Sequence, residues 1–290
     1  MTASWNQAFA PKCTTQGAVL VGLLGTGVSA SRTPRMHMAE GAAQGVPFEY
    51  RLIDADTAAT TPDIPEVLSR LEDAGFDGIN VTFPFKQAVM PYLSSLSDGA
   101  QSVGAVNTVL FRDGARRGDN TDLWGFRESM RRGLPSVRRD TVLLLGAGGA
   151  GGAVAQALID EGAGRVLVQD TDRAKAENLV ERLGAGRGVV VTDLAAAAAS
   201  ADGVVNATPV GMDKLPGLPL PEALIERRHW IADIVYFPLE TALLALARRR
   251  GCAVLPGSGM ALYQAVRAFE LFTGRRPDPE RMWSAFTAVG

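Results

Sequence analysis

The sequence predicts an α/β protein of two domains, and three observations support this fold class. Short apolar runs alternate with helical patterns along the whole chain, which is typical of parallel β-α-β units. A glycine-rich segment, 146–152, joins an apolar run to a helical one near the middle of the chain. The chain has 290 residues, enough for two domains of ordinary size. We therefore expect a separate domain to precede the glycine-rich segment.

The first half of the chain alternates expected strands with expected helices. In order, these are strand 18–24, helix 34–44, strand 48–53, helix 64–74 and strand 78–82. The apolar segment 105–111 is followed by Asp113-Gly114, a pair that favours the tight turns of hairpins. We expect this hairpin at the edge of the first sheet.

The second half has the pattern of a doubly wound sheet. A helix is expected from about residue 120 to 132, followed by helix 153–159 between the first two strands. The short apolar strands are expected at 142–145, 165–169, 188–191, 203–207, 230–233 and 253–255. Two final helices, 260–273 and 279–288, follow the last strand and are free to return to the first domain.

The glycine-rich segment 146–152 has the composition of a dinucleotide-binding turn, in which backbone N–H groups and a helix N-terminus hold a pyrophosphate. Asp170 ends the next predicted strand, near the spacing from Gly146 that is expected for a ribose-binding carboxylate. Its charge would repel the extra phosphate of NADP. NAD is therefore the favoured cofactor. Arg173 could turn toward a phosphate, so NADP remains possible but less favoured.

These features divide the chain into two functional regions. An N-terminal substrate-binding α/β domain is expected at residues 1–118 plus 257–290. A doubly wound Rossmann domain that binds the dinucleotide is expected at residues 119–256.

Composition excludes several classes of protein. The chain has 29 basic and 31 acidic residues, and this balance gives no electrostatic footprint for nucleic acid or an anionic membrane. Its two cysteines, Cys13 and Cys252, are far apart, which argues against a disulfide framework and a zinc site. Residues 1–16 lack a signal-peptide pattern, and no apolar run approaches the roughly 20 residues of a membrane span. We expect a cytoplasmic monomer or homodimer that holds no metal and acts on a small molecule.

Lys86 and Asp122 are candidates for acid/base chemistry. Hydride transfer to or from NAD requires a matching proton transfer on the substrate oxygen. Lys86 follows the strand expected at 78–82, at the edge where open α/β sheets present ligands. A solvated lysine at a helix start would have the same sequence, and Asn120-Thr121-Asp122 is also a good helix-capping sequence. The residues alone leave these alternatives open.

Eight segments, in order along the chain, resemble the shikimate dehydrogenase family, and within it the quinate/shikimate dehydrogenases. They are SRTPRMH (31–37), NVTFPFK (80–86), GAVNT (104–108), NTDLWG (120–125), GAGGAGG (146–152), NATPVGM (206–212), DIVYFP (233–238) and GMALYQ (259–264). The resemblance covers nearly the whole sequence. One such segment is compatible with chance, whereas eight in the family's order are not.

The resemblance implies a role for each matching residue. Lys86 would transfer the proton, with Asp122 hydrogen-bonded to the same substrate hydroxyl. The residues implied around the substrate are Ser31 and Thr33 at its carboxylate and Thr82, Asn107, Tyr236 and Gln264 at its ring and hydroxyls. Those implied around the cofactor are Gly148, Gly149 and Ala150 at the pyrophosphate, Asn206, Thr208 and Pro209 at the ribose, and Val235, Gly257 and Met260 at the nicotinamide. Met212, Val235 and Met260 fit a role in the core equally well.

Two departures from the shikimate pattern indicate the quinate subgroup. The first loop is Ser29-Ala30-Ser31-Arg32-Thr33-Pro34 where dedicated shikimate enzymes have His-Ser-x-Ser-Pro, and Asp170-Thr171-Asp172-Arg173 replaces their NADP signature Asn-Arg-Thr. We therefore expect an NAD-dependent oxidoreductase that interconverts quinate with 3-dehydroquinate and shikimate with 3-dehydroshikimate. The alternatives are an NADP-dependent biosynthetic shikimate dehydrogenase, an aminoshikimate dehydrogenase and a regulator that binds NAD without turnover.

Overall fold

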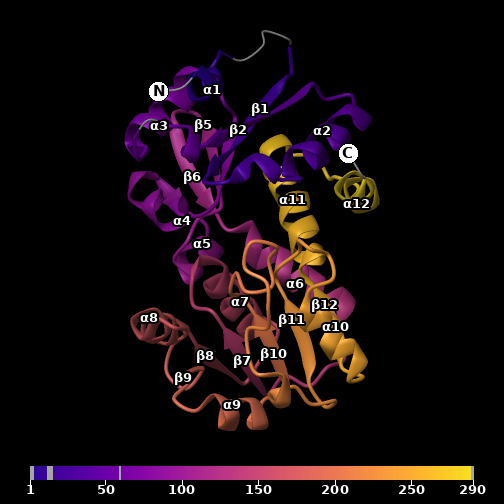
Figure 1. Cartoon of the computed structure of the whole chain (residues 1–290). Coiled ribbons are helices and arrows are strands. Elements are labelled where there is room, and N and C mark those ends of the chain that lie inside the picture. The colour runs from indigo at the N-terminus through magenta and orange to yellow at the C-terminus, as the bar shows by residue number, and fades with distance from the viewer. Residues whose placement is uncertain (1–2, 12–15, 59, 289–290) are drawn as a thin grey trace. The chain divides into compact units, whose positions relative to one another are not determined.

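The computed structural model describes residues 3–11, 16–58 and 60–288 (Figure 1). Cys13 lies outside these residues. The predicted α/β class is confirmed, with two compact units that each contain a six-stranded sheet. Unit 1 comprises Met1–Thr121 and Ala265–Gly290, and unit 2 comprises Asp122–Gln264. These boundaries fall slightly later in the chain than the expected ones after residues 118 and 256.

The sheet of unit 1 has the strand order β2-β1-β3-β5-β6-β4. Strand β1 pairs in parallel with β2 and β3, β5 pairs antiparallel with β3 and β6, and β4 pairs in parallel with β6. The strands are β1 (Val19–Gly25), β2 (Phe48–Asp54), β3 (Gly78–Val81), β4 (Ser95–Leu96), β5 (Thr108–Arg112) and β6 (Ala115–Asp119). The sheet is therefore mixed, with parallel pairs among β1, β2 and β3 and between β4 and β6, and antiparallel pairs on both sides of β5.

The hairpin predicted around Asp113-Gly114 is present as β5 and β6. Both turn residues have left-handed backbone angles, with φ of 52° at Asp113 and 74° at Gly114, as such a turn requires. The expected position of this hairpin at the sheet edge is wrong, because β4 pairs with β6 beyond it. Strand β4 has two residues, too few to produce a recognisable period in the sequence.

Helices of unit 1 pack an apolar core against the sheet. Helix α3 (Ile64–Asp73) begins where the Asp63 carboxylate accepts a hydrogen bond from the Glu66 N–H, and it buries Val67 and Leu68 in that core. The other helices are α1 (Ala3–Gln7), α2 (Thr33–Ala43), α4 (Phe85–Ala88), α5 (Asp98–Val103), α12 (Pro279–Thr287) and the part of α11 (Gly257–Thr273) that follows Gln264. Helices α1, α4 and α5 were not predicted.

Helices α2 and α12 are tied together at both ends of α12. Glu40 of α2 is fully buried and pairs with Arg281 near the start of α12, with 2.7 Å between Oε2 and Nε. Arg32 and Arg35, at the start of α2, both donate to the carbonyl oxygen of Phe286 near the end of α12. Thr33 is the first residue of α2 and Ser31 lies two positions before it, so these contacts fix the helix start beside the predicted carboxylate-binding residues.

His37 of α2 is fully buried in an aromatic environment. Its ring contacts those of Phe48, Tyr50, Phe269 and Phe272, with centroid distances from 5.2 to 6.0 Å. Within the described part of the chain, neither ring nitrogen has a hydrogen-bond partner. Burial lowers the pKa of His37 to about 3, so the ring is neutral near pH 7.

The sheet of unit 2 is parallel throughout, with the order β12-β11-β10-β7-β8-β9. Its strands are β7 (Thr141–Leu145), β8 (Arg165–Gln169), β9 (Gly188–Val190), β10 (Gly203–Asn206), β11 (Trp230–Asp233) and β12 (Ala253–Pro256). Its helices are α6 (Thr121–Gly133), α7 (Gly149–Asp160), α8 (Arg173–Leu183), α9 (Leu194–Ser200), α10 (Ala242–Arg249) and the first part of α11. This is the doubly wound sheet that the sequence predicts.

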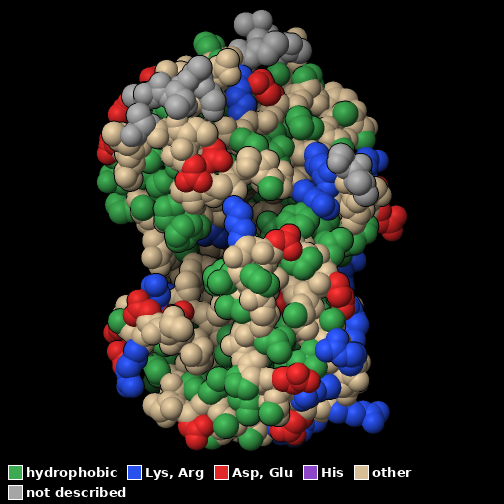
Figure 2. All heavy atoms as spheres, in the orientation of Figure 1, with side chains coloured by type: hydrophobic (Ala, Val, Ile, Leu, Met, Phe, Trp, Pro, Cys, Tyr) green, Lys and Arg blue, Asp and Glu red, His purple; other side chains and the backbone are tan. Residues whose placement is uncertain are grey.

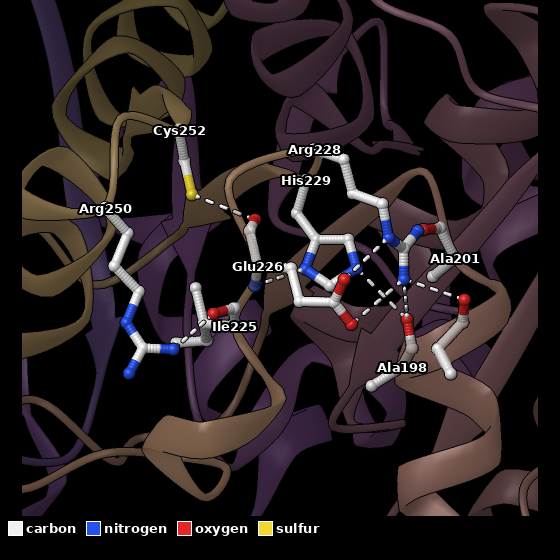
Figure 3. A network of polar contacts seen from close by, with 9 residues as sticks. Ala198, Ala201, Ile225, Glu226, Arg228, His229, Arg250 and Cys252 are labelled. Atoms are coloured by element: carbon white, nitrogen blue, oxygen red, sulfur yellow. Dashed lines mark hydrogen bonds and ion pairs between the residues drawn. The ribbon is translucent and has the colours of Figure 1, made fainter.

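A polar network fixes the loop that leads into β11 (Figure 3). His229 accepts a hydrogen bond from the Glu226 N–H at Nδ1, and its Nε2 lies 3.1 Å from the Ala198 carbonyl oxygen at the end of α9. Arg228 donates to the carbonyl oxygens of Ala198 and Ala201. These contacts tie the segment that precedes β11 to the end of α9.

The charged side chains follow no single-sign pattern on the face shown in Figure 2, where Lys and Arg side chains and Asp and Glu side chains both occur over each unit. Within the described ranges, no helix is long and apolar enough to span a bilayer.

Candidate functional site

The glycine turn of unit 2 has the geometry of an anion site. Gly146 follows β7 with a φ of 99°, and a Cβ there would lie 2.7 Å from the carbonyl oxygen of Ala207, so the position requires glycine. Helix α7 then begins at Gly149, and the first N–H groups of a helix lack acceptors within it. A Cβ at Gly148 would meet no described atom within 4 Å, which leaves space before the helix for a pyrophosphate.

Asp170 lies beside this turn, after β8. Its Oδ2 accepts a hydrogen bond from the Ala147 N–H at 2.7 Å, and its Oδ1 accepts one from the Asp172 N–H at 2.8 Å. Arg173 is the first residue of α8 and forms an exposed ion pair with Glu177, 2.7 Å from Nε to Oε1. The carboxylate is thus held against the glycine turn, whereas the guanidinium is paired along its own helix.

Asn206 organises the turn that follows β10. Its Oδ1 accepts hydrogen bonds from the N–H and the hydroxyl of Thr208, at 3.0 and 2.6 Å. Its Nδ2 donates to the Val210 carbonyl oxygen and to Asp233, both at 2.9 Å. Pro209 is exposed at the outside of this turn. The segment 206–210, predicted to lie beside the ribose, is therefore a compact loop that the buried side-chain amide of Asn206 holds together.

The residues predicted near the nicotinamide differ in burial. Val235 and Met260 are buried, at 6% and 8% exposure, as the core alternative expects, whereas Met212 is 41% exposed and is not a core residue. Gly257 begins α11 next to the end of β11, where a Cβ would lie 2.4 Å from the carbonyl oxygen of Ile234. Gly257 is needed for this close approach of two backbones.

Unit 2 also brings three predicted substrate residues into one region. Asp122 is the second residue of α6 and is buried. Burial of the Tyr236 hydroxyl raises the pKa of Tyr236, and the negative charge of Asp122 raises it further. Gln264 lies on α11, and a Cβ at Gly125 of α6 would lie 2.7 Å from its backbone nitrogen. The close packing of α6 on α11 at Gly125 thus places the helices that carry Asp122 and Gln264 against each other.

In unit 1, two predicted residues follow β3. Thr82 comes directly after this strand, and Lys86 is the second residue of α4, both half-buried. The carbonyl oxygen of Lys86 accepts a hydrogen bond from the Val106 N–H at 2.8 Å, which ties α4 to the segment before β5. Lys86 is thus at the carboxyl edge of β3, as the sequence predicts, and it is not a fully solvated residue.

The loop after β1 approaches this edge. A Cβ at Gly25 would lie 2.2 Å from Cγ2 of Thr82, and the Thr26 N–H donates to the Phe83 carbonyl oxygen at 3.1 Å. The same loop continues to Ser31, whose Oγ accepts a hydrogen bond from the Thr33 N–H at 3.3 Å. Ser31 and Thr33 are half-buried at the start of α2, so their hydroxyls belong to one tight turn.

Asn107 belongs to a buried polar chain whose other members the sequence analysis missed. Tyr50 donates to Oδ1 of Asn80 at 2.7 Å, and Nδ2 of Asn80 donates to the Thr108 hydroxyl at 3.0 Å. Asn107 accepts at Oδ1 from the Thr121 N–H at 2.7 Å and donates from Nδ2 to the Thr121 hydroxyl at 2.9 Å. The amide of Asn107 therefore holds the first residue of α6. Asn80, Thr108 and Thr121 lie in three of the family-like segments, but their residue types alone do not indicate which of them are bonded to one another.

Thr121 is the first residue of α6, which fixes the position of Asp122 in the helix. The N–H of Thr121 is bound by Asn107, and Asp122 lies inside the first turn of α6 rather than before it. Asp122 therefore does not occupy the N-cap position that the capping alternative assigns to it.

The glycine turn, the acidic residue after the next strand and the polar edge of a second α/β unit define an NAD(P)-dependent dehydrogenase. Family models match three stretches of the chain: a shikimate dehydrogenase substrate binding domain at residues 23–109, a shikimate / quinate 5-dehydrogenase at 128–212 and a shikimate 5'-dehydrogenase C-terminal domain at 257–285. The chain belongs to the shikimate dehydrogenase family, whose members are NAD(P)-dependent oxidoreductases acting on CH–OH groups.

The similar relatives include proteins named as NADP(+) enzymes and proteins named as NAD(+) enzymes. It is 48% identical to a shikimate dehydrogenase (NADP(+)) of Streptomyces avermitilis, over 92% of this chain and 94% of that protein. It is 45% identical to a quinate/shikimate dehydrogenase (NAD(+)) of Corynebacterium efficiens, over 94% and 99%. Among solved structures, quinate dehydrogenase from Corynebacterium glutamicum in complex with NAD has a TM-score of 0.89 at 44% identity, covering 94% of this chain and 99% of that one.

Proposed function

We propose that this dehydrogenase interconverts quinate with 3-dehydroquinate and shikimate with 3-dehydroshikimate, and that it prefers NAD to NADP. The observation that carries the cofactor preference is the position of Asp170, held beside the glycine turn by the Ala147 N–H. A carboxylate there accepts hydrogen bonds from ribose hydroxyls and repels a 2'-phosphate. The NAD(+) name of the Corynebacterium efficiens relative supports the same preference.

Several groups of the chain fit the dinucleotide. The N–H groups of Gly148, Gly149 and Ala150, at the start of α7, would hold its pyrophosphate, and Asp170 would hold its adenosine ribose. The loop of Asn206, Thr208 and Pro209 would line the remainder, together with the buried Val235, Gly257 and Met260. When bound, NAD would supply the hydride acceptor for oxidation of the alcohol.

Lys86 and Asp122 are assigned to proton transfer at the substrate hydroxyl. When the alcohol is oxidised, a neutral amine at Lys86 Nζ accepts the hydroxyl proton, and in the reverse reaction the ammonium donates it to the carbonyl oxygen. The carboxylate of Asp122 accepts a hydrogen bond from the same hydroxyl and so orients it. The half-buried position of Lys86 after β3 and the buried position of Asp122 in the first turn of α6 support these roles.

The substrate acid is assigned to the turn before α2. The hydroxyls of Ser31 and Thr33 lie within one turn, which is tied by a hydrogen bond between the two residues, and they would bind the carboxylate of a cyclohexane acid. Neutral donors and acceptors suit its ring hydroxyls. Those assigned to the ring are Thr82, Asn107, Tyr236 and Gln264.

The NADP alternative depends on Arg173. The Arg173 guanidinium forms an exposed ion pair with Glu177 along α8, and such surface pairs are weak, so Arg173 is able to turn toward a 2'-phosphate. The NADP(+) name of the Streptomyces avermitilis relative, at 48% identity, supports the alternative. The two proposals differ in the ratio of kcat/KM for the two cofactors.

Initial rates at 340 nm with quinate, shikimate and aminoshikimate, each with NAD and with NADP, test the proposal. We expect reduction of NAD with quinate and shikimate at a kcat/KM at least about tenfold above that with NADP. A higher kcat/KM with NADP would support the biosynthetic alternative, and activity with aminoshikimate alone would support the aminoshikimate alternative. Calorimetric NAD binding without turnover of any of these acids would support the regulatory one.

A further inference from the structure

Asp233 is a buried carboxylate at the carboxyl end of β11, with 1% of its surface exposed. Its oxygens accept three hydrogen bonds. Oδ1 accepts from Nδ2 of Asn206 at 2.9 Å and from the Val235 N–H at 3.0 Å, and Oδ2 accepts from the Thr241 hydroxyl at 2.7 Å. All three partners are neutral, so these bonds offset the lost hydration of the carboxylate without help from a cation.

The three partners come from three segments that meet at this end of the sheet. Asn206 ends β10, is the register partner of Asp233 and folds the turn that contains Thr208. Val235 belongs to the loop after β11. Thr241 is the N-cap of α10, where its Oγ1 accepts a hydrogen bond from the Leu244 N–H at 3.3 Å. One carboxylate therefore joins the loops after two neighbouring strands to the start of a helix.

This arrangement lies at the edge where doubly wound parallel sheets bind dinucleotides. We propose that Asp233 is a positioning residue that holds the loops of Asn206 and Val235 in the arrangement that receives the nicotinamide end of the cofactor. The inference rests on the proposed function, because it takes these loops to line the cofactor. In this proposal Asp233 acts through the two loops and does not contact the cofactor.

The protonation state of Asp233 gives this role a signature. Burial raises the pKa of Asp233 to about 6, and its three hydrogen bonds oppose this rise. Within the described part of the chain, hydrogen bonds, strand register and close approaches place no titrating residue against it; the neighbours so placed are Asn206, Gly211, Val235, Thr241, Pro256 and Gly257. At pH 8 the group is ionised and accepts all three bonds, whereas below its pKa one oxygen becomes a donor. Asparagine has the same shape and the same mixed donor and acceptor character as the protonated acid.

The test is the dissociation constant of NADH and of NADPH, measured by fluorescence titration of wild type and Asp233→Asn at pH 8 and at pH 5. At pH 8 we expect the variant to bind its preferred cofactor about tenfold more weakly, because a charge-assisted bond is lost and the loops are no longer preorganised. At pH 5 the two proteins are expected to bind alike. Amide hydrogen exchange at Val235 in the cofactor-free protein is expected to be faster in the variant at pH 8.

Asp202→Asn is the matched control. Asp202 directly precedes β10, and its Oδ2 accepts from the Thr141 N–H at 2.9 Å, so it makes the same kind of cross-strand tie at the opposite end of the sheet. We expect this variant to bind NADH as wild type does. Thr241→Val and Thr241→Ser provide a second pair if Asp233→Asn does not fold. The valine variant is expected to weaken binding at pH 8, and the serine variant, which keeps the hydroxyl, to restore it.

The proposal is overturned if Asp233→Asn, or Thr241→Val in its place, keeps the wild-type dissociation constant at pH 8 and the wild-type exchange at Val235. Different results would contradict the proposed function. Absent turnover of quinate and shikimate, or tighter binding of NADPH than of NADH by wild type, would contradict that function. The ratio of the variant's dissociation constant to that of wild type, measured with the preferred cofactor, would still test the role of Asp233.

Discussion

The carboxylate of Asp170 accepts a hydrogen bond from the backbone N–H of Ala147, with 2.7 Å between Oδ2 and the nitrogen. Asp170 follows β8 and Ala147 lies in the glycine turn after β7, so the bond joins the ends of two neighbouring strands. The residue proposed to select the cofactor therefore also holds the turn proposed to bind its pyrophosphate. A substitution that changes the charge of Asp170 is therefore expected to change the conformation of the glycine turn as well.

Replacing Asp170 by Asn is expected to shift the cofactor preference toward NADP. Removal of the negative charge removes the repulsion of the 2'-phosphate, so the ratio of kcat/KM for NADP to that for NAD is expected to rise by at least about tenfold. Asp172→Asn is the control, because Asp172 is exposed and caps α8 through the Ala174 N–H at 3.1 Å. An unchanged ratio in Asp170→Asn, or an equal rise in the control, would remove Asp170 from the selecting role.

Asp122→Asn is expected to lower kcat without loss of stability. The start of α6 is held by the bond from the Thr121 N–H to Asn107, so the helix keeps this contact when Asp122 changes. Steady-state kinetics and thermal melting measure the two effects separately, with Glu128→Gln on the same helix as a control. Normal kinetics combined with a loss of about 1 kcal/mol of stability would instead indicate a purely local role at the helix start.

Gly125→Ala is expected to lower both activity and stability. A Cβ there would lie 2.7 Å from the backbone nitrogen of Gln264 and 2.8 Å from the Met260 carbonyl oxygen, and backbone atoms of a packed helix cannot yield cheaply. Gly133→Ala is the control on the same helix, because its close neighbour is the flexible end of Leu255 at 2.5 Å. Equal losses in the two variants would contradict the claim that α6 must approach α11 at Gly125.

His37 is expected to make the protein less stable in acid. The unfolded chain binds a proton at the ordinary histidine pKa of about 6.5, whereas the folded state does so only near its pKa of about 3. The contribution of His37 to the free energy of unfolding therefore falls as the pH decreases from about 6.5 toward 3, by up to about 1.4 kcal/mol per pH unit.

Urea unfolding at a series of pH values measures this dependence, and His37→Leu removes it. The difference in unfolding free energy between wild type and His37→Leu is expected to change in favour of the variant as the solution is acidified. The comparison cancels the other titrating groups, including Asp233, whose raised pKa acts in the opposite direction between about 3.8 and 6. A difference that stays constant with pH would show that His37 is accessible to protons in the folded state.

Much of the fold could be predicted because its elements carry local signals. The central strands β7 and β10 of unit 2 are largely apolar and are buried along their whole length, which is typical of a parallel sheet covered by helices. The hairpin of unit 1 was predicted from Asp113-Gly114, a pair whose residues adopt left-handed angles readily.

Two of the missed elements, β4 and α8, carry weak local signals. Strand β4 is two residues long and exists through its pairing with β6, and α8 is largely exposed with a narrow apolar stripe at Ala176, Leu179 and Leu183. Neither produces a strong period in the sequence.

The same distinction applies to the site. The glycine turn and Asp170 lie close together in the sequence pattern of one β-α-β unit, so their proximity could be predicted. The bonds of Asp233 to Asn206 and of Tyr50 to Asn80 span 27 and 30 residues, little more than the 23 between Ala147 and Asp170, but no spacing pattern relates these residues. Only the register of the folded sheets brings these side chains together, and residue type alone gave no indication of their partners.

The turnover of Lys86→Ala tests the central claim most directly. With quinate and NAD, and with Gln87→Ala on the same short helix as the control, we expect kcat of Lys86→Ala to fall by roughly 10²- to 10⁴-fold, the range for loss of a general acid/base. The calorimetric affinity for NAD is expected to stay at the wild-type value, because Lys86 is assigned to the substrate and not to the cofactor. A Lys86→Ala variant that retains the wild-type kcat would contradict the account.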